Sequence, residues 1–263
     1  MPEPLLLDSV TRAGAEARGR VLVTGSHGGR ITAALALAAG ARAAVFHDAG
    51  VGLEGAGIGG LGWLEGHGMA AATVDHRSAP IGQAGAMLAA GVISHANAGA
   101  RACGVAPGMP CAEAAARLAA APMPTSTAEV PAEARAVLNP AGARRRLVLA
   151  DSASLVRPED AGQVVVTGSH GALFGTDPAN ALKADAFLAL FNDAGGGPGT
   201  TRLPVLAARG VAAATVAAAT ARIGQARSTW HDGVISACNP QAEALGAHPG
   251  QRAADLVARA LAT

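Results

Sequence analysis

The chain has 263 residues, long enough to bury a substantial core, and its formal charge is +1, with 20 Lys and Arg against 19 Asp and Glu. No cluster of Lys and Arg is interleaved with aromatic residues, which makes nucleic acid a poor candidate partner. The single lysine, Lys183, lies in a segment that we expect to be helical, which argues against Schiff-base chemistry and a phosphate-loop lysine.

The amino-terminal segment resembles neither a secretory signal nor a membrane span. Met-Pro-Glu-Pro is acidic, and three leucines follow it. The Ala-rich run after Arg30 is interrupted at Arg42, well short of the roughly 20 apolar residues that cross a bilayer. Cys103, Cys111 and Cys238 match no zinc or disulfide spacing. We therefore expect a soluble, cytoplasmic protein with neither a membrane nor a nucleic acid as partner.

An internal repeat is the most informative pattern in the chain. Val-Thr-Gly-Ser-His-Gly ends at Gly28 and again at Gly171, and Ile-Gly-Gln-Ala occurs at 81–84 and 223–226. Such self-similarity predicts a tandem duplication. The predicted organisation is a first α/β repeat at 1–121, a Pro/Ala-rich linker with one short helix at 122–146, and a second α/β repeat at 147–263.

Each repeat, of roughly 115 residues, has the pattern of βαβ units around a mostly parallel sheet. Short Val-rich runs end in Gly, Ser, His or Asp and alternate with Ala/Leu stretches of helical period. The fold class is therefore α/β, with two pseudo-twofold-related parallel-sheet lobes. The expected central strands are 20–24, 43–46 and 70–74, then 163–167, 186–191 and 211–216, although 186–191 could equally be helical.

The Thr-Gly-Ser-His-Gly loop follows an expected strand and precedes a helix that begins near Arg30. Its backbone N–H groups and the helix N-terminus predict a site for an anion or oxyanion. A tight turn with a capping serine is the alternative interpretation. We assign catalytic roles to Ser26 and His27, and substrate binding to Gly25, Gly28, Ser169 and His170.

The next expected strand in each repeat ends in an aspartate, and the following ones end in groups that differ between the repeats. Because ligands of α/β proteins bind outside the carboxyl ends of the strands, these positions predict an enzyme site. His76 or His95 would be the general base, oriented by Asp75 or Asp48, and Ser26 or Ser94 the nucleophile. From the other positions, Asn97, Asp193, Ser236 and Asn239 are predicted to bind substrate.

Arg222 replaces Pro80 of the first repeat and is predicted to clamp a substrate carboxylate or phosphate, with Arg77 as a second candidate. Histidines together with aspartates would also suit zinc or another divalent ion. The spacing contains no metal-binding motif, so our prediction is a site without a cofactor, and a metal is the alternative.

These features favour a hydrolase of a small polar or anionic molecule, with an amide or cyclic amide bond as the preferred target. One alternative is a cofactor-independent racemase, isomerase or lyase, in which each half places a base on one face of the substrate. The other is a protein that binds a small anion without turnover. The Ala/Gly-rich helices suggest close packing against a second copy, so we expect a homo-oligomer.

Overall fold

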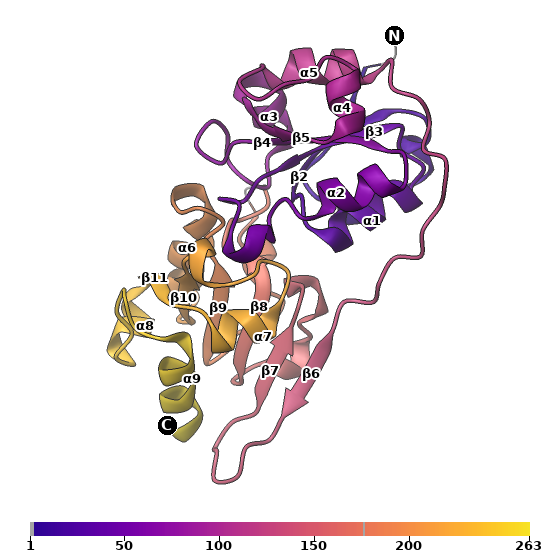
Figure 1. Cartoon of the computed structure of the whole chain (residues 1–263). Helices are drawn as coiled ribbons and strands as arrows, with labels where there is room; N and C mark the ends of the chain where they lie inside the picture. Colours follow the sequence, from indigo (N-terminus) through magenta and orange to yellow (C-terminus); the bar gives the residue numbers. More distant parts are fainter. Residues whose placement is uncertain (1–2, 176) are drawn as a thin grey trace. The chain divides into compact units, whose positions relative to one another are not determined.

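The computed structural model describes residues 3–175 and 177–263, which form two α/β units (Figure 1). The first unit comprises Met1–Val51 and Gly55–Ala132, and the second comprises Gly52–Glu54 and Glu133–Thr263. Each unit contains one sheet in which most neighbouring strands are parallel, so the predicted α/β class is confirmed. Within the described residues, no helix has the length and apolar character needed to cross a membrane.

The sheet of the first unit has the strand order β1-β2-β3-β4-β5, in which β5 alone is antiparallel to its neighbour. The strands are β1 (Leu5–Leu7), β2 (Val21–His27), β3 (Ala43–His47), β4 (Ala70–Val74) and β5 (Ile93–Ala96). The helices are α1 (Arg30–Ala38), α2 (Gly60–Gly66), α3 (Ala84–Ala90), α4 (Ala98–Ala102) and α5 (Cys111–Leu118).

Helices cover both faces of this sheet, α1 and α2 on one face and α3, α4 and α5 on the other (Figure 1). The strand residues alternate accordingly. Ala44 and Phe46 pack with Leu37 and Leu64, whereas Val45 packs with the cluster that contains Met87. Because both faces of the strands are buried, their sequences are apolar throughout and show little polar alternation.

The second unit repeats this arrangement with one added strand, in the order β11-β10-β9-β8-β7-β6. The strands are β6 (Arg135–Leu138), β7 (Leu147–Ala150), β8 (Val164–His170), β9 (Leu188–Asn192), β10 (Ala212–Val216) and β11 (Ile235–Cys238). The helices are α6 (Arg202–Ala208), α7 (Ala226–His231), α8 (Pro240–Ala244) and α9 (Ala253–Ala262). The segment that ends at Phe191, ambiguous in the sequence, is strand β9.

Three local expectations differ from the structure. Strand β6 lies in the segment predicted as a linker with a short helix, and it pairs antiparallel with β7. Lys183 lies in an irregular segment after the 3₁₀ turn Pro178–Ala181, so its Ala-rich context does not form a helix. Helix α1 has no helical counterpart in the described part of the second unit, where Gly171 is followed by irregular chain. Pro178 lacks a backbone N–H, which opposes a continuous helix there.

Candidate functional site

Strand pairing brings two aspartates together in the first unit. In the parallel pair β3 and β4, His47 lies opposite Val74, so both strands end at the same level of the sheet. The residue after β3 is Asp48, and its backbone N–H donates to the carbonyl of Val74 at 2.9 Å. Asp75 and His76 follow β4 directly. The register therefore places the two carboxylates and the imidazole beside one another at the carboxyl edge.

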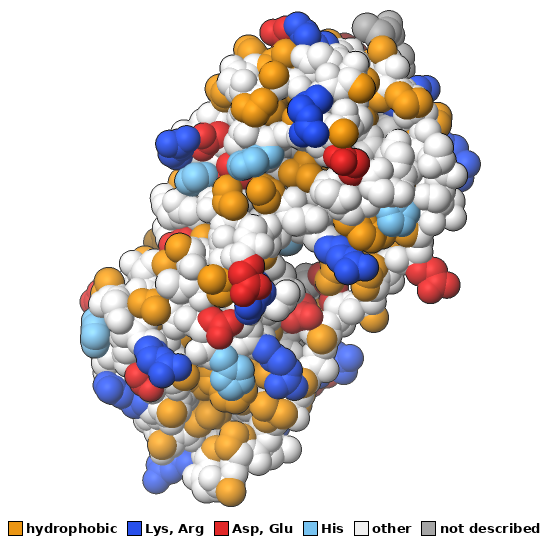
Figure 2. Space-filling view, viewed as in Figure 1, with side chains coloured by type: hydrophobic (Ala, Val, Ile, Leu, Met, Phe, Trp, Pro, Cys, Tyr) orange, Lys and Arg blue, Asp and Glu red, His pale blue; other side chains and the backbone are white. Residues whose placement is uncertain are grey.

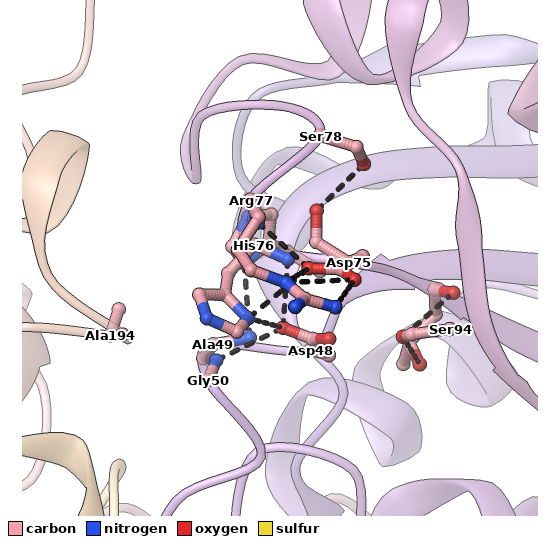
Figure 3. Close-up of polar contacts among 12 residues, drawn as sticks. Asp48, Ala49, Gly50, Asp75, His76, Arg77, Ser78, Ser94 and Ala194 are labelled. Atoms are coloured by element: carbon pink, nitrogen blue, oxygen red, sulfur yellow. Dashed lines mark hydrogen bonds and ion pairs between the residues drawn. The ribbon is translucent and has the colours of Figure 1, made fainter.

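Asp48 and His76 form a hydrogen-bonded pair, shown in Figure 3. Nδ1 of His76 lies 3.0 Å from Oδ1 of Asp48, which also accepts the backbone N–H groups of Gly50 and His76 at 3.0 Å each. A proton on Nδ1 satisfies this contact and leaves the lone pair of Nε2 free. The Asp48 side chain is 3% exposed and that of His76 is 26% exposed, so the imidazole is reachable while its carboxylate is buried.

Asp75 lies against the same imidazole but is held by a cation. Its Oδ1 is 3.5 Å from Nδ1 of His76, and its carboxylate accepts Nε of Arg77 at 3.0 Å and Nη2 at 2.5 Å. The hydrogen bonds from Arg77 hold the pKa of Asp75 well below its usual range. Asp75 is therefore ionised, and it positions the 78% exposed guanidinium of Arg77 next to His76.

The same three side chains are the group that could hold a metal ion among the described residues. One ligand atom from each of Asp48, Asp75 and His76 lies within 4.8 Å of the others, and carboxylates with an imidazole suit zinc. Two observations oppose this use. Nδ1 of His76 faces Asp48 at hydrogen-bond distance, and the cation of Arg77 already neutralises Asp75. The geometry favours a proton over a metal between the imidazole and the carboxylate.

The second unit has the same aspartate without the histidine. Oδ1 of Asp193 accepts the N–H groups of Gly195 at 3.0 Å and Ala218 at 2.9 Å, as Asp48 accepts those of Gly50 and His76. Each aspartate therefore organises the loop that follows its strand. What distinguishes the first unit is the imidazole at the position of Ala218.

The loop after Asp48 is also more strained than its counterpart. Ala49 and Val51 adopt positive φ angles of 50° and 64°, a conformation that is a genuine outlier for a β-branched residue. The second unit has Ala194 at φ 50° followed by three glycines with positive φ, Gly195 to Gly197. Strain of this kind concentrates at functional sites. Val51 was not singled out from the sequence.

His47 is buried beside the pair and is replaced by Asn192 in the second unit. Nδ1 of His47 accepts the N–H of Ala49 at 3.0 Å, and Nε2 lies 3.0 Å from the carbonyl of Ala79. Asn192 makes the equivalent two bonds, to the N–H of Ala194 and the carbonyl of Ala221. The imidazole of His47 and the amide of Asn192 therefore make the same two hydrogen bonds in their units. Burial lowers the pKa of His47, which favours the neutral imidazole.

Replacing His47 with Asn is expected to leave the free energy of unfolding within about 1 kcal/mol of the wild type near neutral pH, and to reduce acid sensitivity. Because the pKa of His47 is lowered from 6.5 in the folded protein, the unfolded wild type takes up a proton that the folded protein does not. Wild-type stability therefore falls as the pH decreases through 6.5. Urea unfolding at about pH 7.5 and about pH 5 should show a smaller loss in the variant. An equal loss in both proteins would contradict a neutral His47.

The first glycine of the Gly-Ser-His-Gly sequence, Gly25 in the first unit and Gly168 in the second, packs closely against a neighbouring backbone segment. A Cβ on Gly25 would lie 2.6 Å from the carbonyl carbon of Gly82 and 2.7 Å from the carbonyl oxygen of Asp8. A Cβ on Gly168 would meet the equivalent backbone atoms of Gly224 and Asp151. Gly25 is therefore required for the close crossing of two backbone segments, and this explains its occurrence in both repeats without a substrate.

Two backbone N–H groups of the segment predicted to bind an anion donate hydrogen bonds to other groups of the protein. Gly28 N–H donates to the carbonyl of His47 at 2.9 Å, and Gly29 N–H donates to Nδ1 of His27 at 3.1 Å. Burial lowers the pKa of His27 to about 4, so this imidazole is neutral near pH 7. Moreover, residues 24–27 belong to strand β2 and not to a loop. These two amides therefore already have partners within the protein, and their oxyanion role remains a prediction.

The two serines of this sequence tie neighbouring segments together. Oγ of Ser26 accepts the N–H of Val10 at 3.0 Å, and Oγ of Ser169 accepts that of Ala153 at 2.8 Å. Nδ1 of His170 accepts the N–H of Ala172 at 3.2 Å. Ser26 is 7% exposed and makes the same contact as Ser169, so each serine holds a neighbouring backbone segment; a nucleophilic role for Ser26 remains a prediction.

Asn97 and Asn239, predicted to bind substrate, have no hydrogen-bonding capacity left for it. Oδ1 of Asn97 accepts the N–H groups of Ala71 and Ala100, and Nδ2 donates to the carbonyls of Leu61 and Met69. An asparagine side chain can make no further strong bonds. Asn239 makes the equivalent four bonds. Both residues cap a short helix and connect it to the sheet, so the structure gives them a structural role, and substrate binding by them remains a prediction.

Ser94 and Ser236 also serve the sheet. Oγ of Ser94 lies 3.0 Å from Oγ1 of Thr73, and Ser236 contacts Thr215 at the same distance. Ser94 lies apart from the Asp48–His76 pair in Figure 3. His95, the other predicted base, has Nδ1 3.5 Å from Oγ1 of Thr73. Neither residue contacts the pair, so of the two predicted bases it is His76 that lies against a predicted orienting aspartate.

Arg222, the predicted substrate clamp, is occupied by carboxylates. Its Nη1 lies 3.0 Å from Asp232, and Nε and Nη2 bind Glu54, which groups with the second unit. An arginine that already holds two carboxylates is poorly suited to a third anion. Arg77, named only as a second candidate in the sequence, is the arginine that lies beside the imidazole.

A cavity of about 290 Å³ occurs in the second unit and contains none of the predicted site residues. It is lined at the amino ends of β9 and β10 by Phe187, Val211 and Ala212, with Arg209 and Gln241 at its side. On the face seen in Figure 2, Lys and Arg side chains are dispersed among acidic and apolar ones.

No family model, curated protein or solved structure matches the chain.

Proposed function

We propose that the chain is a hydrolase of a small polar or anionic molecule and that His76, oriented by Asp48, is its general base. The contact of 3.0 Å between Nδ1 and Oδ1 carries this proposal, because it fixes the imidazole with Nε2 as the proton acceptor. For an amide substrate, Nε2 would take a proton from water as the water oxygen attacks the carbonyl carbon of the amide. The same proton then passes to the amide nitrogen, which leaves as the C–N bond breaks.

Arg77 supplies the positive charge for this reaction. Nη1 of Arg77 donates no hydrogen bond to the described residues, whereas Nε and Nη2 are held by Asp75. A fixed guanidinium beside a general base would stabilise an oxyanion or bind a substrate carboxylate. This role replaces the one first assigned to the glycine-rich loop. It also supports an anionic or carbonyl-containing substrate and a reaction without a metal cofactor.

Hydrolysis is favoured over racemisation by the second unit. A two-base racemase would place one base in each pseudo-symmetric half. The positions equivalent to His76 and His95 are Ala218 and Ala237, so the second unit offers no imidazole at either place. We also propose that the chain arose by tandem duplication. In support, Asp48 and Asp193 each accept two backbone N–H groups at equivalent positions of their own units. A cytoplasmic homo-oligomer also remains a prediction.

Isotope labelling of turnover tests the proposed reaction. The wild-type protein would be incubated with a panel of small amides, lactams and esters in ¹⁸O-labelled water, with and without a chelator. Hydrolysis is expected to place one labelled oxygen in the carboxylate product, at a rate that the chelator leaves unchanged. Deuterium entering recovered substrate from D₂O without ¹⁸O incorporation would establish an isomerase instead, and loss of rate with the chelator would establish a metal enzyme.

A further inference from the structure

Arg202, the first residue of α6, is the largest fully buried side chain among the described residues and is only 2% exposed. Its counterpart at the start of α2 is Gly60, and their backbone N–H groups make equivalent bonds to the carbonyls of Gly171 and Gly28. A Cβ on Gly60 would lie 2.6 Å from Ala33 of helix α1. Because α1 has no helical counterpart among the described residues of the second unit, the arginine has room there.

The surroundings of Arg202 satisfy only part of its guanidinium. Nε donates to the carbonyl of Ala172 and Nη1 to that of Ala181, both at 2.9 Å. The guanidinium carbon lies 5.5 Å from the ring centre of Phe174 and 5.1 Å from that of Phe191. In the described part of the chain, Nη2 donates to no acceptor and no carboxylate pairs with this cation.

A buried cation without an anion is unusual. Removing a charge from water costs several kcal/mol, whereas a desolvated contact with an aromatic face returns about 2 kcal/mol or somewhat more. Burial lowers the pKa of Arg202 only to about 10, so the charge persists at neutral pH. Other partly buried arginines of this unit, Arg135 and Arg209, each bind an aspartate. Among the described residues, the one fully buried side-chain N or O atom without a partner is Oε1 of Gln241, so the unpartnered Nη2 of Arg202 retains some access to solvent. Arg202 thus offers a donor that a ligand can reach and a charge that no carboxylate of the described residues compensates.

We propose that Arg202 forms an anion site in the second unit, in which the free N–H groups of Nη1 and Nη2 bind one carboxylate or phosphate group of a small molecule. The aromatic rings of Phe174 and Phe191 keep the guanidinium in place. This site is separate from the Asp48–His76 pair and does not depend on the proposed reaction.

Thermal unfolding in the presence of inorganic phosphate or acetate tests this site. At constant ionic strength set with sodium chloride, one of the two anions is expected to raise the melting temperature of the wild type with a saturating dose response. The anion that saturates at the lower concentration identifies the phosphate or carboxylate source. No saturating rise with either anion would overturn the proposal.

Two variants locate the effect. Arg202→Lys retains the charge but loses bidentate geometry, so binding is expected to weaken about tenfold or more. Arg227→Met changes the net charge at an exposed position of α7 and is expected to bind as the wild type does. An unchanged dose response in a folded Arg202→Lys protein would overturn the assignment to Arg202. The wild-type titration remains decisive if Arg202→Lys fails to fold.

Discussion

Replacing His76 with Ala is expected to lower kcat about 10²–10⁴-fold, the contribution of a positioned general base. The free energy of unfolding should change by no more than about 1 kcal/mol. Ala218 occupies the equivalent position in the second unit, and its N–H still binds Asp193 at 2.9 Å, so alanine is compatible with this loop. Steady-state kinetics with the substrate found by labelling, together with urea unfolding, measures both effects.

Matched substitutions separate catalysis from structure. Asp48→Asn and Asp193→Asn keep an oxygen that can accept the two backbone N–H groups of each loop, but only Asp48 contacts an imidazole. Asp48→Asn should therefore reduce kcat strongly, and Asp193→Asn should affect stability alone. His248→Ala removes an exposed histidine that lies outside the proposed site, and it is expected to leave kcat unchanged. Full activity in His76→Ala with loss of activity in His95→Ala would place the base on β5 and contradict the proposal.

The same variants address the alternative of an anion-binding protein without turnover. A binding protein has no kcat to lose, so the failure of the whole substrate panel would favour that interpretation. Loss of turnover in His76→Ala with unchanged substrate affinity would support an enzyme, because a general base acts mainly in the transition state.

Replacing Gly25 with Ala is expected to destabilise the protein by about 3 kcal/mol or more. The added methyl group would lie 2.6–2.7 Å from backbone atoms of Asp8, Gly82 and Gln83. Backbone atoms of this crossing cannot turn aside as a flexible side chain can. Relief would require the segment after Gly82 to move, and the bond from Gly82 N–H to the Gly25 carbonyl would be lost. Urea unfolding of the purified variant measures the effect.

Gly62→Ala is the matched control for this prediction. Gly62 lies in helix α2, is exposed, and a Cβ there meets nothing within 4 Å. Alanine should stabilise a helix interior by about 0.5–1 kcal/mol relative to glycine. Opposite signs for the two variants would confirm that Gly25 serves the backbone crossing. A Gly25→Ala protein as stable as the wild type would instead return this glycine to the list of ligand-binding candidates.

The strand positions could be predicted from the sequence because they depend on local pattern. Ala43–His47 and Ala70–Val74 are apolar, end in polar residues and have counterparts in the second repeat. These features place Asp48 and His76 at strand ends before any contact is known. The partner of the imidazole was not predictable, since two histidines and two aspartates met the same criteria. The register between β3 and β4 selected Asp48 and His76.

Sequence repetition by itself does not separate residues that bind a ligand from residues that pack the fold. Gly25 and Asn97 occur in both repeats for reasons of backbone crossing and helix capping, which only the distances to Gly82 and Ala71 reveal. Composition also gave no sign that the described residues after Gly171 lack an equivalent of α1. The sequence by itself determined most of the central strands, the polar residues at their ends and the recurring motifs. Tertiary structure decided which polar groups are saturated by the protein and which remain free, because those contacts join residues far apart in the chain.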